Sequence, residues 1–211
     1  MLIDLHNHTY ISSPDSSLSP DELIETARVR GLQGLCVTEH FCIAGAEVTR
    51  ETGDRLNFPV FRGIEARCDL GDMLVFGYYH DIPAGIPFAD LFCLVREAGG
   101  VLFAAHPFRP EVYRLQAGFQ ARGLDLERDW GHRPCLRQLD GFEVVNGKDP
   151  AAVNGQARRL ARMLGAPGIG GSDAHTLSEV ARAATRFRRK IHADADLVLA
   201  LAAGEYEAVL L

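Results

Sequence analysis

The N-terminal stretch Leu2-Ile3-Asp4-Leu5-His6-Asn7-His8 decides the fold prediction. A short, mostly apolar run ends in two histidines with one residue between them, which is typical of a buried strand that delivers polar side chains at its end. In extended backbone, residues i and i+2 point to the same side, so His6 and His8 can reach a common centre. The stretch therefore predicts a strand over 2–5 with two candidate metal ligands at its carboxyl end.

Segments of the same kind recur along the chain and alternate with helix-like segments. The predicted strands span 2–5, 34–38, 60–64, 73–78, 101–105, 141–145 and 168–171, followed by a final apolar run at 208–211. The predicted helices span 20–30, 88–98, 150–164, 178–184 and 193–203. Ser19-Pro20-Asp21-Glu22 is a capping box with proline at the first helical position. This order predicts repeated βα units, as a parallel barrel or an open parallel sheet.

Composition narrows the class of protein. With 211 residues, 47% hydrophobic and 24% charged, the chain is typical of a globular protein of one domain. A net charge of -6 argues against a long nucleic-acid partner. Five cysteines without a C-x-x-C pair argue against disulfides and a cysteine zinc site. No membrane span or leader is evident, so we expect a cytoplasmic protein with no membrane partner.

Ligand-type side chains collect where the predicted strands end. In a parallel α/β protein these ends open on one face, where active sites form. Six of the eight histidines, two acidic residues and an aspartate in the first loop belong to this set: His6, His8, Asp15, His40, Glu65, His80, His106, Asp173 and His175. His132 and His192 do not fit the pattern and are expected on the surface.

The size of this set predicts how many ions it holds. Imidazole and carboxylate without thiolate suit Zn, Mn or Fe, and each ion needs about three or four protein ligands if a position stays open for water. The set exceeds what one ion can use. We therefore expect two or three divalent ions close together, with Glu65 as a bridge because its carboxylate has two oxygens.

The motifs together resemble a known family. Asp4-Leu5-His6-Asn7-His8-Thr9, Thr38-Glu39-His40, Gly63-Ile64-Glu65, Ala105-His106-Pro107 and Gly171-Ser172-Asp173-Ala174-His175 occur in the order found in the PHP family of metal-dependent phosphoesterases, named for polymerase and histidinol phosphatase. The resemblance runs from Met1 to about Phe187. It implies one domain over 1–211, a distorted (β/α)7 TIM-like barrel with a trinuclear metal site at the carboxyl ends of its strands.

The resemblance also distributes the ligands among three ions. The first ion would be held by His6, His8, Glu65 and Asp173. The second would share Glu65 and add His80 and His106. The third would take Asp15, His40 and His175. The stretch Glu143-Val144-Val145-Asn146-Gly147 resembles a segment of short stand-alone members, where Glu143 and Asn146 would orient ligands or substrate.

Phosphoester hydrolysis suits such a centre because clustered ions stabilise charge on both the attacking and the leaving oxygens. We expect metal-bound hydroxide as the nucleophile and a small phosphate monoester, such as histidinol phosphate or a nucleotide, as the substrate. The residues expected to carry catalysis are Glu65, His40, Asp173 and His175. If the third ion is absent, His40 or His175 could instead protonate the leaving group. Arg109, Asn146 and Lys148 are expected to bind the substrate.

Three alternatives stay open. An amidohydrolase-type enzyme would also use H-x-H on the first strand, but many of those enzymes bridge their metals with a modified lysine, and neither lysine here is near the fourth strand. A phosphodiesterase or exonuclease acting on nucleotides or short oligonucleotides would use the same centre. A non-catalytic metal-binding domain would be expected to have lost ligands, whereas every aligned position here holds His, Asp or Glu.

The long segment 108–139 is a candidate lid or a surface excursion.

Overall fold

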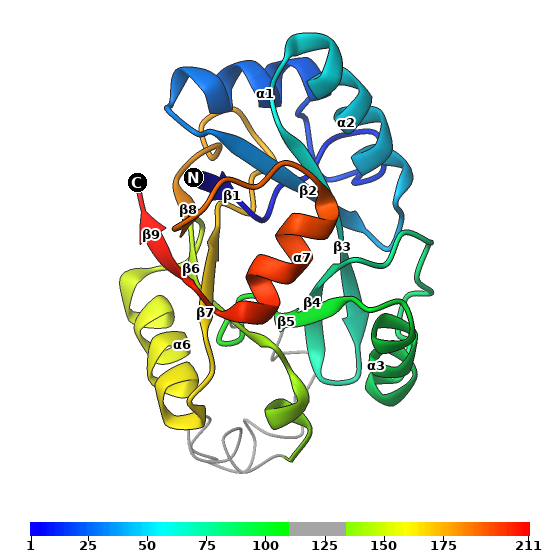
Figure 1. Ribbon diagram of the computed structural model, residues 1–211, viewed down its shortest axis with the longest axis vertical. Helices are drawn as coiled ribbons and strands as arrows, with labels where there is room; N and C mark the ends of the chain where they lie inside the picture. The colour runs from blue at the N-terminus through cyan, green and yellow to red at the C-terminus, as the bar shows by residue number, and fades with distance from the viewer. Residues whose placement is uncertain (110–133) are drawn as a thin grey trace.

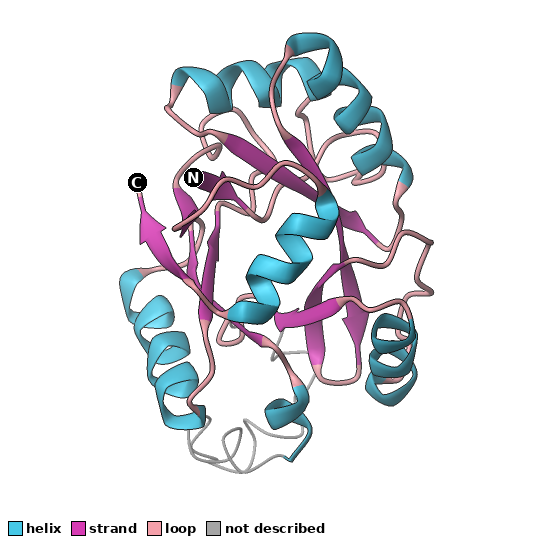
Figure 2. Ribbon diagram, in the orientation of Figure 1, coloured by secondary structure: helices cyan, strands magenta, loops and turns pink. Residues whose placement is uncertain are grey.

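A computed structural model describes residues 1–109 and 134–211. Its main element is a nine-stranded mixed sheet in the order β7-β6-β5-β4-β3-β2-β1-β8-β9, which curves into a nearly closed barrel (Figures 1 and 2). The strands are β1 (Leu2–Asp4), β2 (Gly34–His40), β3 (Val60–Cys68), β4 (Gly71–Phe76), β5 (Val101–Ala104), β6 (Gly141–Asn146), β7 (Gly168–Gly171), β8 (Ala183–Phe187) and β9 (Tyr206–Leu210). The predicted barrel-type α/β fold is confirmed.

The strand directions differ from a purely parallel barrel. β1, β2 and β3 are parallel neighbours, and so are β5, β6 and β7. β4 runs antiparallel to both β3 and β5, because only Asp69 and Leu70 separate β3 from β4 and so short a connection makes a hairpin. The carboxyl end of β4 therefore lies opposite to those of the parallel strands, and its first residues lie on their side.

The end of the chain holds two corrections. The helix predicted over 178–184 is wrong: Ala181 has a left-handed φ of 57°, and the chain turns into β8. β8 pairs antiparallel with β1 and with β9. The pairing between β8 and β9 starts at Tyr206, so the strand predicted over 208–211 begins two residues earlier.

Helices cover the outside of the sheet and one mouth of the barrel. They are α1 (Pro20–Val29), α2 (Ala44–Leu56), α3 (Phe88–Glu97), α6 (Ala151–Leu164) and α7 (Asp194–Ala203), with a short 3-10 helix η2 (Pro134–Gln138). The Ser19 capping box predicted for α1 is present. α7 lies across the barrel in Figure 1, and its buried Leu197 and Leu201 join the core inside the barrel. The polar site lies at the other mouth.

The helix α2 was not predicted from the sequence. Its N-cap residue, Ile43, offers no side-chain cap, and the helix contains Gly45 and Gly53, which lower helix propensity. A Cβ at Gly53 would lie 2.5 Å from Val60 Cγ2, so the glycine lets α2 lie close to β3. Packing therefore decides this helix. The candidate lid 108–139 falls largely in 110–133, outside the described residues.

Candidate metal centre

The first two candidate ligands follow β1 directly. The side chains of His6 and His8 are fully buried, and each Nε2 lies 3.5 Å from Glu65 Oε2. The same two nitrogens lie 3.7 and 3.5 Å from Asp173 Oδ1. The H-x-H pair thus reaches one centre shared by a residue from β3 and a residue that follows β7.

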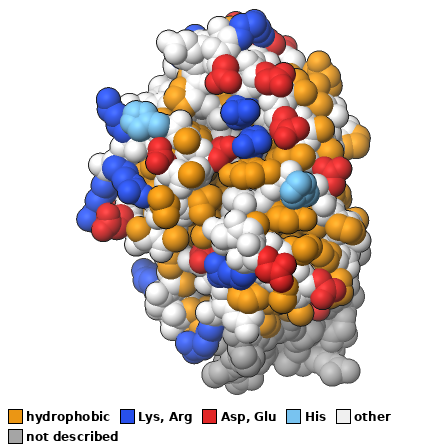
Figure 3. Space-filling view, turned by 45° about the vertical axis from the view of Figure 1, so that its right-hand side comes forward, with side chains coloured by type: hydrophobic (Ala, Val, Ile, Leu, Met, Phe, Trp, Pro, Cys, Tyr) orange, Lys and Arg blue, Asp and Glu red, His pale blue; other side chains and the backbone are white. Residues whose placement is uncertain are grey.

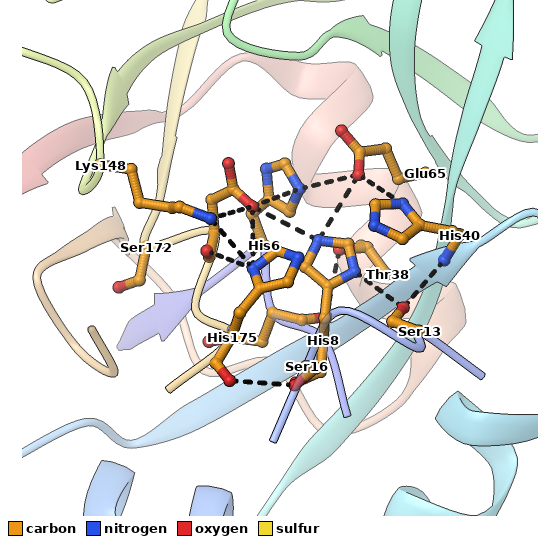
Figure 4. Close-up of polar contacts among 12 residues, drawn as sticks. His6, His8, Ser13, Ser16, Thr38, His40, Glu65, Lys148, Ser172 and His175 are labelled. Carbon is orange, nitrogen blue, oxygen red and sulfur yellow. Dashed lines mark hydrogen bonds and ion pairs between the residues drawn. The ribbon is translucent and has the colours of Figure 1, made fainter. Parts of the chain in front are cut away.

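Glu65 lies in the middle of the cluster. Its Oε2 is 3.0 Å from His40 Nδ1 at the end of β2, and its Oε1 is 2.9 Å from His106 Nε2, which follows β5. Figure 4 shows the rings of His8 and His40 turned toward this carboxylate. Because Oε2 faces three imidazoles and Oε1 faces a different one, that of His106, Glu65 has the geometry that a bridging ligand requires.

The third part of the cluster joins a loop to the end of β7. Asp15 Oδ2 lies 3.4 Å from His40 Nε2 and 3.3 Å from His175 Nε2, although the Asp15 side chain is 60% exposed. Asp173 and His106 have φ values of 55° and 26°, a region that residues other than glycine rarely adopt. Backbone strain of this kind concentrates at functional sites.

Buried ring nitrogens of this cluster fit a positively charged partner. His6 Nε2, His8 Nε2 and His106 Nδ1 have no hydrogen-bond partner in the described structure, and buried polar atoms are rarely left so. Four groups of three residues bring ligand atoms within 4.8 Å of one another: His6, His8 and Glu65; His6, His106 and Asp173; His8, His40 and His175; and Glu65, Asp72 and His106. Imidazole and carboxylate donors of this kind fit divalent ions.

The electrostatics of the cluster also fit a bound cation. Burial opposes charge on His6, but Glu143, Asp173 and Glu65 raise its pKa well above the ordinary value. Burial would raise the pKa of Glu65, yet His6, His106 and His40 hold it well below the ordinary value. Burial lowers the pKa of His8 to about 3, so its ring is neutral. A cation would take the place of the His6 proton.

A layer of buried residues holds these side chains from β6. Glu143 Oε1 lies 2.9 Å from His6 Nδ1, and its Oε2 accepts the His106 backbone N–H at 2.8 Å. Asn146 donates from Nδ2 to Glu143 and, at 3.3 Å, to Asp173. The structure therefore places Asn146, a predicted substrate-binding residue, in the fully buried layer beneath the cluster.

The two predicted cationic substrate residues, Arg109 and Lys148, line a pocket beside the cluster. The pocket has a volume of about 860 Å³ and is also lined by the candidate ligands Asp15, His40, Glu65, His106, Asp173 and His175. Arg109 is already engaged with acidic partners, Asp149 at 2.9 Å and Asp173 at 2.6 Å. Lys148 Nζ lies 3.2 Å from His175 Nδ1.

The structure does not bring His80 to the cluster. Because β4 is antiparallel to its neighbours, its carboxyl end, which His80 follows, lies at the opposite end of the barrel from the cluster. His80 is exposed there and contacts the Tyr78 ring. Asp72, near the start of β4, lies where His80 was expected, within reach of Glu65 and His106. The sequence analysis missed Asp72, although the hairpin sequence Cys68-Asp69-Leu70-Gly71 could have revealed the direction of β4. His192 is exposed, and His132 lies outside the described residues.

Fold and cluster together define a barrel protein whose His, Glu and Asp side chains can hold metal ions at the strand ends. A family model described as the PHP domain matches residues 4–114, and a second, described as PHP-associated, matches residues 152–206. The chain therefore belongs to the PHP family, which confirms the resemblance seen in its motifs.

Individual proteins resemble this chain in sequence or in fold. A Methanocaldococcus jannaschii protein, MJ1587, is 28% identical over 155 residues, 69% of this chain and 82% of its own length. A phosphoribosyl 1,2-cyclic phosphate 1,2-diphosphodiesterase of Eggerthella lenta is 40% identical over 65 residues, 31% of this chain and 24% of that protein. A Bacteroides vulgatus structure, a two-domain protein containing a predicted PHP-like metal-dependent phosphoesterase, superposes with a TM-score of 0.74 at 19% identity, over 100% of this chain and 64% of that one.

Proposed function

We propose that the protein is a metal-dependent phosphoesterase that hydrolyses a small phosphate monoester. The proposal rests on the buried Nε2 atoms of His6 and His8, which lie beside Glu65 and Asp173 in a chain of the PHP family. Neither nitrogen has a hydrogen-bond partner within the described residues. An ordinary core would not leave two imidazoles without partners next to two carboxylates.

We assign residues to ions from the family resemblance, with Asp72 added from the groups of neighbouring ligand atoms. His6, His8, Glu65 and Asp173 would hold one ion, and Asp15, His40 and His175 another. A further ion would take Glu65, His106 and Asp72, which replaces His80. Divalent Zn, Mn or Fe in such a cluster supplies positive charge that activates water and stabilises the phosphoryl oxygens during displacement.

Two side chains of the protein would bind the substrate and transfer a proton to the leaving group. Lys148, at the mouth, would hold a phosphate oxygen with its ammonium group. His40 is only partly buried and lies next to Asp15, so it could pass a proton to the leaving oxygen where no ion occupies that position. Phe41 and Val153 add apolar surface to the same pocket.

Size and charge favour a small substrate. A pocket of about 860 Å³ falls within the range of small-molecule sites. The chain carries a net charge of -6, whereas a protein that tracks a long nucleic acid usually has a basic stripe. On the one face that Figure 3 draws, Lys and Arg side chains are interspersed with Asp and Glu. Over residues 1–109 and 134–211, no helix has the length and apolar character needed to cross a bilayer.

A phosphodiester substrate is the second candidate. The Eggerthella lenta relative is named as a diphosphodiesterase of a cyclic phosphate, and its matched segment is 40% identical. The same ligand cluster would serve either ester, because the ions act on the phosphoryl group that both share. A nucleotide or cyclic phosphate diester would then be the class of substrate.

The test compares p-nitrophenyl phosphate with bis(p-nitrophenyl) phosphate. Protein stripped of metal should be inactive, and resupply with Mn, Zn or Fe should restore turnover of the monoester. A preference for the diester would favour the second candidate. Asp173→Asn, which keeps the shape but removes the charge, should lose most activity. Metal-loaded protein that turns over neither ester, nor any of a panel of phosphorylated metabolites, would contradict the proposal.

A further inference from the structure

Glu39 is a buried carboxylate that the proposed chemistry does not use. It lies in β2, is fully buried, and accepts hydrogen bonds on both oxygens. The backbone N–H of Thr9 donates to it at 3.1 Å, and the Thr9 hydroxyl donates to the same carboxylate. The Ser13 hydroxyl donates to its other oxygen at 2.5 Å. All of its donors come from the loop that follows the two β1 histidines.

Ser13 links this carboxylate to His8. A hydroxyl has one proton to donate and two lone pairs that accept. The Ser13 proton goes to Glu39, so Ser13 Oγ can only accept from its other two neighbours, His8 Nδ1 at 3.2 Å and the His40 backbone N–H at 3.3 Å. Figure 4 shows Ser13 between these two groups.

The direction of this chain of hydrogen bonds fixes the ring proton of His8. If His8 Nδ1 donates to Ser13, the proton of the neutral ring is on Nδ1 and the lone pair is on Nε2. Nε2 is the atom that lies 3.5 Å from both Glu65 and Asp173 and that has no hydrogen-bond partner among residues 1–109 and 134–211. A metal ligand requires this arrangement, because only an unprotonated nitrogen can coordinate an ion.

The first turn of α2 supports Glu39 as the acceptor. A Cβ at Gly45, the second residue of α2, would lie 2.3 Å from Glu39 Oε1, so the carboxylate lies against the helix N-terminus. The partial positive charge at that end favours an anion. Burial raises the pKa of Glu39, and the hydrogen bonds from Ser13 and Thr9 oppose that rise.

We propose that Glu39 is a positioning residue that acts through Ser13 to hold His8 in the Nδ1-protonated form, with Nε2 ready to bind a metal ion. Glu143 does the same for His6 by direct contact between Oε1 and Nδ1 at 2.9 Å. Each of the two β1 histidines therefore has its own buried carboxylate. The inference rests on the metal centre of the proposed function, but the position of the ring proton is independent of the substrate.

Glu39→Gln tests the inference because it keeps the shape and reverses one hydrogen bond. The amide oxygen of the glutamine would accept the hydrogen bonds from Thr9, and its NH2 group would donate to Ser13 Oγ. Ser13 would then donate to His8 Nδ1 and move the ring proton to Nε2. Imidazole nitrogen shifts in long-range 1H–15N spectra of the metal-free protein at pH 7.5 report this directly. We expect Nδ1–H in the wild type and Nε2–H in Glu39→Gln.

Metal affinity gives the second readout. Chelator competition with Zn or Mn should show binding about 10- to 100-fold weaker in Glu39→Gln, the usual effect of removing a partner behind a metal-bound histidine. Ser13→Ala should leave a mixture of both ring forms and an intermediate affinity. The matched control is Glu47→Gln on the exposed face of α2, where neither readout should change.

The inference is overturned if His8 carries its proton on Nε2 in the wild type, or if Glu39→Gln and Ser13→Ala both keep Nδ1–H and the wild-type affinity. If circular dichroism shows that Glu39→Gln does not fold, Ser13→Ala, which removes only one oxygen, tests the inference instead. A Ser13→Ala protein with His8 fully in the Nδ1–H form and with wild-type metal affinity would then overturn it. Neither readout involves hydrolysis, so the two proposals can fail separately. If the protein hydrolyses no phosphate ester but the Glu39→Gln change still moves the His8 ring proton to Nε2, the proposed function is contradicted and this inference stands.

Discussion

The Arg109 guanidinium donates to Asp173 Oδ2 at 2.6 Å, while Asp173 Oδ1 faces His6, His8 and His175. The two oxygens of one candidate ligand thus have different neighbours: Oδ2 accepts from Arg109 and Asn146, and Oδ1 lies beside three imidazoles. Arg109 also donates to Asp149 and Asn146. Its position indicates a partner that orients Asp173 and balances its charge, in addition to the predicted contact with substrate.

The first prediction concerns stability without metal. Arg109→Met keeps the length of the side chain but leaves the 3% exposed Asp173 carboxylate without its cationic donor. Removal of one partner from such a buried pair costs on the order of 3 kcal/mol. We expect a clear loss of unfolding free energy in EDTA and a smaller loss with metal bound, because the ion then compensates the charge.

Thermal and urea unfolding with and without Mn measure this difference. Arg55→Met is the control, because the Arg55–Asp21 pair is exposed on both sides and should contribute less than about 1 kcal/mol. Equal losses in EDTA and in Mn would contradict the charge-balancing role of Arg109.

The second prediction separates Asp72 from His80. Asp72 lies within reach of Glu65 and His106, whereas His80 is exposed beyond the other end of β4. Asp72→Ala should therefore lower the number of bound ions per chain by one, and His80→Ala should leave it unchanged. Elemental analysis after dialysis against limiting free metal gives the count. Loss of an ion in His80→Ala alone would reverse this assignment.

The sequence could predict most of this cluster because its motifs are local. His6 with His8 and Asp173 with His175 each lie within three residues at a strand end, so correct strand ends were enough to group them. His80 failed because its position depended on the direction of β4. That direction follows from the two-residue turn between β3 and β4, and the predicted strands 60–64 and 73–78 stopped short of it.

Glu39 and α2 were out of reach for a different reason. Glu39 belongs to the Thr38-Glu39-His40 motif, but nothing in its neighbours indicates that its partners are Thr9 and Ser13, which lie 26 to 30 residues away. α2 lacks a side-chain cap and contains two glycines, so local propensity argues against it. Its glycines are explained only by the close contacts that they permit with Glu39 and Val60.

The third prediction concerns Asp4, at the end of β1. Burial raises its pKa to about 7. Oδ1 accepts the His6 and Ser172 backbone N–H groups, and Oδ2 has no hydrogen-bond partner in the described part of the chain. A raised carboxyl pKa means that the folded state binds the proton more tightly than the unfolded chain. The contribution of Asp4 to stability is therefore full below about pH 4 and is lost as the pH rises to about 7.

Asp4→Asn removes this titration. In metal-free protein, the unfolding free energy of the variant relative to wild type should rise by about 1.4 kcal/mol per pH unit between about pH 4 and 7, then level off. Urea unfolding at pH 5, 6, 7 and 8 measures the difference, and all other groups cancel between the two proteins. A difference that does not change with pH would show that Asp4 titrates normally.

The fourth prediction assigns Lys148 to the substrate. His175 Nδ1 lies 2.9 Å from the Asp173 carbonyl and 3.2 Å from Lys148 Nζ, and it cannot both donate to the carbonyl and accept from the ammonium. If His175 binds an ion through Nε2, its proton is on Nδ1 and goes to the carbonyl. The Lys148 ammonium, at the pocket mouth, is then left to bind a phosphate oxygen.

Lys148→Met should therefore raise KM for the phosphate ester about 10- to 100-fold, the worth of a hydrogen bond to a charged group, with the number of bound ions unchanged. Lys190→Met is the matched control, since Lys190 is the other lysine of the chain and lies exposed in a different segment. Steady-state kinetics and elemental analysis on the same samples separate the two effects. Loss of an ion with an unchanged KM would instead make Lys148 a support of the metal centre, because removal of a group that only binds substrate leaves the ligands in place.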